Sequence, residues 1–349
     1  MKDLSKKILG SLTMAAIGDT MGSATENLPH SVILEKFNGG LTEFVKPDKT
    51  AFAYGNEIGE VTDDFSQIYY ISKNVCENNG IIDFETIKKS IIMWSNIPRF
   101  FNRFAGPSTR SAIEMYKTNS EDIKPLNGAT VPDYASKATN GAAMKISPAG
   151  LFNYKNINKA IEDSIIITRV THDNHLAISG AAAVAAAVCA SLEENASVES
   201  IIEAGLYGAK LGEEKGKEIS RYVAGASVIE RTKLALEIVE LDLSKEEKLQ
   251  KLYDVVGSGL HISESVPCAF GLIALNKEDP YQAVIDAVNI GYDTDTIATI
   301  VGAIVGGIID IEKHLDMLYT IEKANNFDIQ RLANDITKYA LKNFETLKN

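Results

Sequence analysis

Cysteine is scarce in this chain, which has three in 349 residues. Cys76, Cys189 and Cys268 are far apart, odd in number and free of any Cys-x-x-Cys pairing. This distribution argues against a disulfide framework and against a zinc site built on thiolates. It suits a reducing compartment, so we expect a cytoplasmic protein.

Basic residues are outnumbered by acidic ones, with 35 Lys and Arg against 47 Asp and Glu, which gives a formal net charge of −12. A surface this negative repels phosphate backbones, so we expect no nucleic-acid binding. An anionic ligand would need a local device, such as a helix N-terminus or a metal ion.

Long, strongly apolar runs are also missing. Residues 176–192 carry no charge, but they are mostly Ala with Gly and Ser and fall short of the ~20 strongly apolar residues of a membrane span. We interpret them as a buried helix and expect no membrane association. Residues 8–17 superficially resemble a secretory signal, but Asp3 and Asp19 do not suit one, so an amphipathic first helix is the better interpretation.

The pattern that is present is helical almost throughout. Apolar residues recur at three- and four-residue spacing in residues 84–95, 157–170, 198–211, 218–239, 246–256 and 329–344. No run shows the alternation of a strand bounded by hairpin turns. We therefore predict an all-α fold, with any strands short and local, and a single domain over residues 1–349.

Two of the expected helices and two irregular stretches stand out. Residues 178–190 and 297–309 are rich in small residues, which lets neighbouring backbones approach closely and suits the centre of a helix bundle. Residues 38–60 and 119–139 are rich in Gly and Pro and longer than most loops in compact domains. Such loops usually serve a site.

Hydroxyl and carboxyl side chains cluster before two apolar helices. Thr62, Asp63 and Asp64 come directly before one apolar pattern, and residues 293–296 (Asp-Thr-Asp-Thr) precede a small-residue helix expected from Ile297. Taken alone, each cluster is ordinary helix capping, because acids near an N-terminus complement the helix dipole.

Two such helices in one core could bring their acidic ends together. Four carboxylates at one place repel each other unless they are protonated or neutralised by cations. Oxygen ligands without His or Cys favour Mg²⁺, Mn²⁺ or Ca²⁺ over zinc. A pair of such ions would bind adjacent hydroxyls or phosphate oxygens and lower the pKa of a bridging water. Two unrelated helix caps remain the alternative.

Three further segments are candidates for ligand contact. Glu26 follows the Gly-Asp-Thr-Met-Gly run of residues 18–22, although a solvated Glu is the alternative. Residues 140–144 form a small-residue turn whose amides could bind a phosphate or ribose, or which is purely structural. His172 precedes the Ala-rich helix and could donate to a diphosphate there, with capping by Thr171 or Asp173 as the alternative.

Six motifs run in a fixed order along the chain: GDTMGSATE, GEVTDDFSQ, GPSTRSAI, NGAAMKISPAG, THDNH and ESVPCAFGLIAL…AVNIGYDTDTIATIVGAIVGG, within a resemblance that spans residues 8 to about 311. Together they resemble the ADP-ribosylglycohydrolase family. The resemblance implies a compact orthogonal bundle of helices with two Mg²⁺ or Mn²⁺ ions in a cleft. It also implies hydrolysis at the anomeric carbon of an ADP-ribosyl group, carried by a protein side chain such as arginine or by a small molecule.

The resemblance also implies roles for individual residues. The implied metal ligands are Thr62, Asp63, Asp64, Asp293, Asp295 and Thr296, with Asp295 bridging. The implied catalytic residues are Glu26, Asp63 and Asp295. The implied contacts to ADP-ribose are Gly106, Pro107, Ser108, Asn140, Gly141, Ala142 and His172.

The chain departs from the family pattern at three positions. Phe65 stands where a hydroxyl residue usually follows Thr-Asp-Asp, Tyr292 replaces a Gly, and His175 stands where many members have Pro. None removes an implied ligand, but Phe65 and Tyr292 could reshape the cleft. Two other functions stay open: hydrolysis of a free nucleoside or nucleotide N-glycoside, and non-catalytic binding of ADP-ribose, as in crystallin-like proteins.

Overall fold

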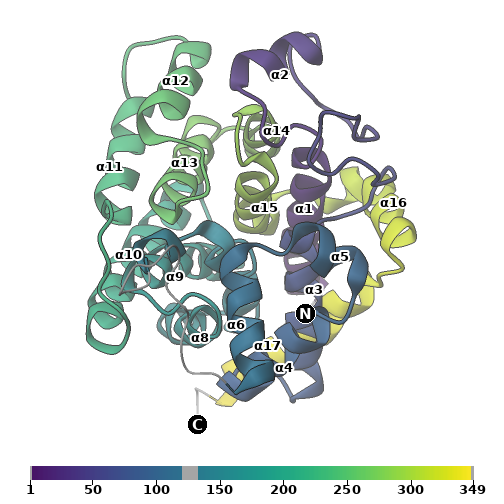
Figure 1. Ribbon diagram of the computed structural model, residues 1–349, viewed down its shortest axis with the longest axis vertical. Coiled ribbons are helices and arrows are strands. Elements are labelled where there is room, and N and C mark those ends of the chain that lie inside the picture. Colours follow the sequence, from purple (N-terminus) through teal and green to yellow (C-terminus); the bar gives the residue numbers. More distant parts are fainter. Residues whose placement is uncertain (1, 120–132, 347–349) are drawn as a thin grey trace.

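The computed structural model describes residues 2–119 and 133–346, which form helices joined by loops (Figure 1). The α-helices are α1 (Lys2–Gly22), α2 (His30–Lys36), α3 (Asp63–Glu77), α4 (Phe84–Trp94), α5 (Pro98–Phe104), α6 (Pro107–Thr118), α7 (Ser147–Leu151), α8 (Ile157–Arg169), α9 (His175–Ser191), α10 (Val198–Ile219), α11 (Val228–Val239), α12 (Lys245–Lys251), α13 (Ile262–Leu275), α14 (Pro280–Asn289), α15 (Thr294–Val305), α16 (Leu315–Asn325) and α17 (Ile329–Thr346). Short 3₁₀ turns are η1 (Ala135–Lys137), η2 (Asn140–Ala142), η4 (Gly306–Ile308) and η5 (Ile311–His314), and η3 (Leu252–Val256) is a π-helical turn. Strand-type pairing in the described ranges is limited to isolated bridges. The all-α prediction is confirmed.

Helix α1 runs through the centre of the molecule (Figure 1). Every residue from Gly10 to Glu26 is buried. Helices α14, α15, α16 and α17 all pack against α1, so no side of its second half faces water. The first helix is amphipathic, as expected, only in its first turns, where Asp3 and Lys6 are exposed and Leu4 and Ile8 are buried. The expectation fails for the second half, because a segment enclosed by other helices needs no polar face.

Helices α1 and α15 pack antiparallel with their backbones in contact. A Cβ atom on Gly18 would overlap the carbonyl oxygen of Ala298, and one on Gly302 would overlap the backbone of α1. Only glycine permits this approach. The packing sets the C-terminal end of α1 against the N-terminal end of α15, where Thr294 Oγ1 donates to the carbonyl oxygen of Gly22 at 2.9 Å.

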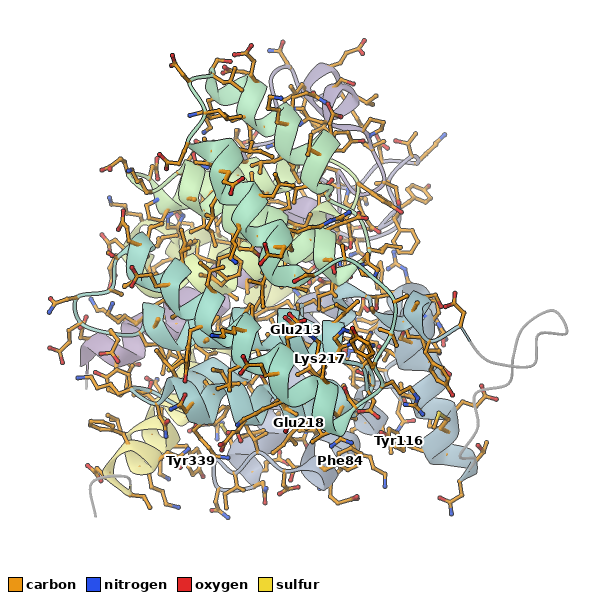
Figure 2. The ribbon with its side chains drawn as sticks, turned by 90° about the vertical axis from the view of Figure 1, so that its left-hand side faces the viewer. Phe84, Tyr116, Glu213, Lys217, Glu218 and Tyr339 are labelled. Atoms are coloured by element: carbon orange, nitrogen blue, oxygen red, sulfur yellow. The ribbon has the colours of Figure 1, made fainter. Side chains whose placement is uncertain are left out.

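Helix α9 is the Ala-rich helix expected to be buried, and all of its residues are. It packs against α8, α10 and α13. Lys217 and Glu218 of α10 are exposed on the outer surface of this layer (Figure 2). Among the described residues, no helix has both the length and the apolar character needed to cross a bilayer.

One expected helix, residues 218–239, is interrupted in the structure. The chain leaves α10 before Arg221 and becomes helical again only in α11. In between it pairs with the segment that precedes α9, since His175 N donates to Arg221 O at 3.0 Å and Arg221 N donates to Asp173 O at 3.4 Å. These bonds satisfy backbone groups that a continuous helix would have used internally.

The segment before α9 also differs from the expected cap. Asn174 Oδ1 accepts a hydrogen bond from Ala177 N at 2.9 Å, so the cap is Asn174 and not Thr171 or Asp173. Of the two long irregular stretches, residues 38–60 are irregular in the structure, and residues 120–132 of the second lie outside the described residues.

Candidate active site

The carboxylates from the two acidic clusters line one cleft of about 320 Å³, which α1, α3, α6 and α15 reach with their ends. The candidate residues that line it are Glu26, Asp63, Asp64, Gly106, Pro107, Ser108, Asn140, Gly141, His172, Asp293, Asp295 and Thr296. Thr62 and Ala142 do not line the cleft. Both are fully buried, Ala142 because it belongs to the hydrophobic core.

Helix α3 is fixed to α1 at the cleft. Thr62 Oγ1 accepts from Asp64 N at 3.3 Å, so the predicted cap of this helix is confirmed. Asp19 of α1 accepts from Thr62 N at 3.0 Å and from Phe65 N at 2.9 Å. Asp19 therefore holds the first turn of α3, a role that no pattern in the sequence indicated.

We expect Asp19→Leu to destabilise the protein by about 3 kcal/mol, because it leaves two buried N–H groups without an acceptor. Asp19→Asn is the matched control, since its amide oxygen can replace Oδ2, which accepts from both Thr62 N and Phe65 N. Chemical denaturation measures both variants. Equal losses in the two would show that the hydrogen bonds to α3 are not what Asp19 contributes.

The second acidic cluster opens α15, which begins at Thr294 and not at Ile297 as expected. Asp293 is in the N-cap position, but its side chain makes no capping bond. It instead accepts a hydrogen bond from Asn140 Nδ2. This bond joins the turn at residues 140–142 to the start of α15, so the two segments form one side of the site.

Three carboxylates come closest to each other. One oxygen from each of Glu26, Asp293 and Asp295 lies within 4.8 Å of the others. Asp64 belongs to the same electrostatic group, because its charge is among the causes that raise the pKa of Asp295, after burial and the charge of Glu26. The two clusters, distant in the sequence, thus meet as their position before two core helices suggested.

Burial dominates the electrostatics of this group. It raises the pKa of Glu26 to about 9, with a further contribution from the charge of Asp293. It raises the pKa of Asp63 to about 8, assisted by the charge of Asp19. The pKa of Asp64 is held well above its ordinary range for the same reason. Unless cations neutralise them, several of these groups stay protonated near neutral pH.

The acidic group has unused ligand atoms. Glu26 Oε2 and Asp64 Oδ1 are buried and accept no hydrogen bond from the described part of the chain. Buried acceptors without a donor are rare and costly. Because the group offers carboxylate oxygens and no His or Cys, it fits a hard divalent cation such as Mg²⁺ or Mn²⁺.

Uncharged donors line another part of the cleft. Ser108 and Thr109 lie in the first turn of α6, where backbone N–H groups are free of intrahelical bonds. His172 is buried with Nδ1 2.7 Å from Thr171 Oγ1 and Nε2 2.9 Å from Thr139 Oγ1. Burial lowers its pKa well below the ordinary value, so the imidazole is neutral. Both ring nitrogens are engaged, and His172 can donate to a ligand only by giving up one of these bonds.

Nearly the whole chain matches a known protein family. A family model described as ADP-ribosylglycohydrolase matches residues 1–343. The chain belongs to the ADP-ribosylglycohydrolase family. Membership assigns the chain to hydrolases that act on ADP-ribosyl groups.

Relatives are found in bacteria. The chain is 31% identical over 340 residues to the uncharacterized protein YegU of Escherichia coli (strain K12), covering 96% of this chain and 97% of YegU. It is 24% identical over 336 residues to ADP-ribosylarginine hydrolase Tri1 of Serratia proteamaculans (strain 568), covering 92% of this chain and 77% of Tri1. A solved structure named ADP-ribosylglycohydrolase-related protein complex superposes with a TM-score of 0.63 at 18% identity, covering 97% of this chain and 100% of that chain. This last match shows a shared fold.

The departures from the pattern of the ADP-ribosylglycohydrolase family lie outside the cleft lining. Phe65 is fully buried and packs near Phe327 in the core. Tyr292 adopts a left-handed backbone with φ of 65° directly after Gly291 with φ of 99°. Glycine is favoured at both positions by this conformation, and Tyr292 adopts it at a cost in backbone strain.

The lining also includes residues that sequence reasoning did not single out. They are Asn27, Phe52, Arg103, Phe104, Ala105, Thr109, Thr139 and Leu260. Phe52 comes from the irregular residues 38–60, so that stretch reaches the site, as its length suggested. Arg103 Nη1 donates to Asn56 Oδ1 at 2.6 Å and ties α5 to the same stretch.

Proposed function

We propose that this member of the family is a metal-dependent hydrolase that cleaves the glycosidic bond of an ADP-ribosylated protein side chain, such as ADP-ribosyl-arginine, and releases ADP-ribose. The observation that carries the proposal is the meeting of the Glu26, Asp293 and Asp295 carboxylates in a cleft that also receives the start of α6. The arginine linkage is supported by the name of the relative Tri1.

The proposed metal site uses oxygen ligands from both acidic clusters. The residues proposed to hold two divalent cations are Thr62, Asp63, Asp64, Asp293, Asp295 and Thr296. Mg²⁺ or Mn²⁺ bound there would fix the ribose hydroxyls and lower the pKa of a water molecule. In this proposal Thr62 contributes its hydroxyl from the edge of the acidic group, where Thr62 Oγ1 lies 3.4 Å from Asp64 Oδ2.

The protein's own groups would stabilise the reaction in two ways. Cleavage of a ribosyl bond passes through a transition state with oxocarbenium character. The carboxylates of Glu26, Asp63 and Asp295, proposed as the catalytic residues, provide negative potential where that positive charge develops. Glu26 accepts from Asn27 Nδ2 at 3.3 Å, which leaves its other oxygen available to orient water.

The diphosphate would be bound by backbone donors. Gly106 and Ser108 at the start of α6 and Gly141 of the following turn line the cleft and are the proposed donors. Pro107 and Asn140 line it too and would contact the ligand in other ways, because Pro107 has no N–H and Asn140 N already donates to Leu260 O at 2.9 Å. A helix N-terminus attracts anions through its free N–H groups and its dipole. The start of α6 would therefore allow a chain with a formal net charge of −12 to bind an anionic ligand.

Release of ADP-ribose tests the proposal. We expect the protein to release ADP-ribose from an ADP-ribosyl-arginine peptide with Mg²⁺ or Mn²⁺ present, and to stop when the ions are removed by EDTA and resume when they are restored. Chromatography of the products measures the rate. The same assay with ADP-ribosyl-serine, an acetylated ADP-ribose and free nucleosides compares the alternative linkages.

The outcomes separate the candidate functions. Cleavage of free nucleosides, with no release from ADP-ribosyl substrates, would contradict the proposal and favour the nucleoside hydrolase. Tight binding of ADP-ribose by the metal-loaded protein without turnover of any linkage would favour a non-catalytic binding protein.

A further inference from the structure

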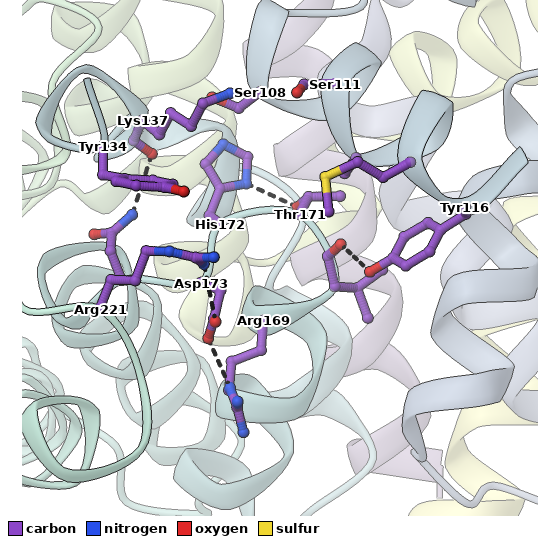
Figure 3. Close-up of a pocket in the computed structure, with 14 residues that line it drawn as sticks. Ser108, Ser111, Tyr116, Tyr134, Lys137, Arg169, Thr171, His172, Asp173 and Arg221 are labelled. Carbon is purple, nitrogen blue, oxygen red and sulfur yellow. Dashed lines mark hydrogen bonds and ion pairs between the residues drawn. The ribbon is translucent and has the colours of Figure 1, made fainter. Parts of the chain in front are cut away.

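A second pocket, of about 220 Å³, adjoins the cleft. Ser108 and His172 line both spaces, so the two spaces are adjacent. Figure 3 shows several long charged side chains around this second space. We call it the basic pocket, because three of its charged residues are basic: Lys137, Arg169 and Arg221. The fourth charged residue is Asp173.

The basic pocket holds three cationic side chains but a single carboxylate, and only two of the cations pair with it. Asp173 Oδ1 pairs with Arg169 Nε at 2.8 Å, and Asp173 Oδ2 pairs with Arg221 Nη1 at 3.3 Å, as the dashed lines in Figure 3 indicate. Lys137 Nζ has no hydrogen bond or ion pair within the described ranges. The pocket thus carries an excess of two positive charges in a protein whose formal net charge is −12.

The cations are held in place against their mutual repulsion. Asn174 Nδ2 donates to the backbone oxygen of Lys137 at 3.3 Å, and the guanidinium of Arg221 lies 4.4 Å from the ring centroid of Tyr134. Burial and the nearby charge of Arg221 both lower the pKa of Lys137. Like charges kept together in this way cost free energy that an anion between them would remove.

We propose that the basic pocket binds a phosphate on the nucleoside end of the ligand, so that the preferred ligand carries a phosphomonoester in addition to the diphosphate of ADP-ribose. This inference rests on the proposed function, in which the hydrolysed ribose lies at the carboxylates and the diphosphate lies at the start of α6. The part of the ligand that passes Ser108 and His172 is then the nucleoside. Unmodified adenosine is uncharged and offers these cations no anionic partner, whereas a phosphomonoester does.

Calorimetric titration of the metal-loaded protein tests this inference. ADP-ribose and 2′-phospho-ADP-ribose are suitable probes, because neither retains the bond to be hydrolysed and both stay intact during the titration. We expect the additional phosphate to raise the affinity by about tenfold at low salt, through charge-assisted hydrogen bonds, and the gain to shrink as salt is added.

Lys137→Met is the decisive variant. We expect it to remove most of the difference between the two ligands and to change the affinity for ADP-ribose by a much smaller factor. Lys210→Met is the matched control, because it makes the same charge change at an exposed position of α10 that lines neither space. Thermal denaturation shows that both variants are folded.

Two results would overturn the inference in different ways. Equal affinities for the two ligands in the wild-type protein, or a gain that survives in Lys137→Met, would refute the phosphate site and leave the proposed function intact. Failure of both ligands to bind would contradict the proposed function together with the phosphate site.

Discussion

Replacing Asp295 by asparagine is expected to abolish divalent-cation binding and to lower the rate of ADP-ribose release by about a thousandfold or more. Asp295 is 5% exposed, and one of its oxygens lies within 4.8 Å of an oxygen of Glu26 and of Asp293. Asparagine keeps the shape of the side chain but substitutes an N–H donor for a ligand oxygen and removes a negative charge. Calorimetric titration with Mn²⁺ and the peptide assay measure the two losses.

Unfolding can be separated from loss of the site in this experiment. Burial and neighbouring charges disfavour the ionised form of Asp295, so the metal-free variant should be at least as stable as the metal-free wild type at neutral pH. Asp286→Asn is the control: Asp286 is also buried, but its side chain binds Asn276, Gln282 and Lys245. We expect that variant to lose stability and to keep cation affinity. Retention of Mn²⁺ affinity by Asp295→Asn would remove Asp295 from the proposed site.

The parts of the fold that could be predicted are those encoded in neighbouring residues. The cap at Thr62 depends on a hydroxyl only two residues from the backbone N–H of Asp64 that it accepts from, and the small residues of α9 indicate close packing whatever the partner is. Both signals are local. The interrupted helix after α10 could not be predicted, because the bonds that end it come from Asp173 and His175 in a distant segment.

The same division between local signals and contacts from distant segments holds for the residues of the site. The acidic clusters were visible because their residues are adjacent in the chain and stand before apolar helices. Asp19 was not, since its partners are backbone N–H groups more than forty residues away, and a backbone donor leaves no mark on the sequence. The basic pocket was also invisible, because Lys137, Arg169 and Arg221 come from three separate segments and approach each other only through the fold.

The protein freed of divalent cations is expected to lose stability as pH rises, with the steepest loss between about pH 5 and pH 7. In the folded state the pKa of Glu26 is about 9 and that of Asp63 about 8, against ordinary values of 4.5 and 3.8. Below the ordinary values both states are protonated and the contribution is absent. As pH rises, the unfolded chain releases protons that the folded chain keeps, so unfolding becomes more favourable until the folded groups also ionise.

Divalent cations should reverse this dependence. They replace the protons as the partners of the ionised carboxylates and bind only the folded state, so the stabilisation they give grows with pH. Thermal denaturation across this pH range, in EDTA and in excess Mg²⁺ or Mn²⁺, measures the effect; each kcal/mol corresponds to a shift of about 2 °C in Tm. If the Tm of the metal-free protein rises between pH 5 and pH 7, the prediction is wrong. That result would show that folding does not raise the pKa values of these carboxyl groups.

One buried base opposes the carboxylates above pH 7. Lys145 is fully buried, its Nζ donates to Gly141 O at 2.5 Å, and burial lowers its pKa to about 7 although the charges of Asp63 and Asp64 act to raise it. Between that value and the ordinary 10.5 the unfolded chain binds the extra proton, so this group adds stability as pH rises. The loss in the metal-free protein should therefore flatten above pH 7. It should continue to higher pH in Lys145→Met and become shallower in Glu26→Gln, because the first variant removes the opposing group and the second removes one of the groups that cause the loss.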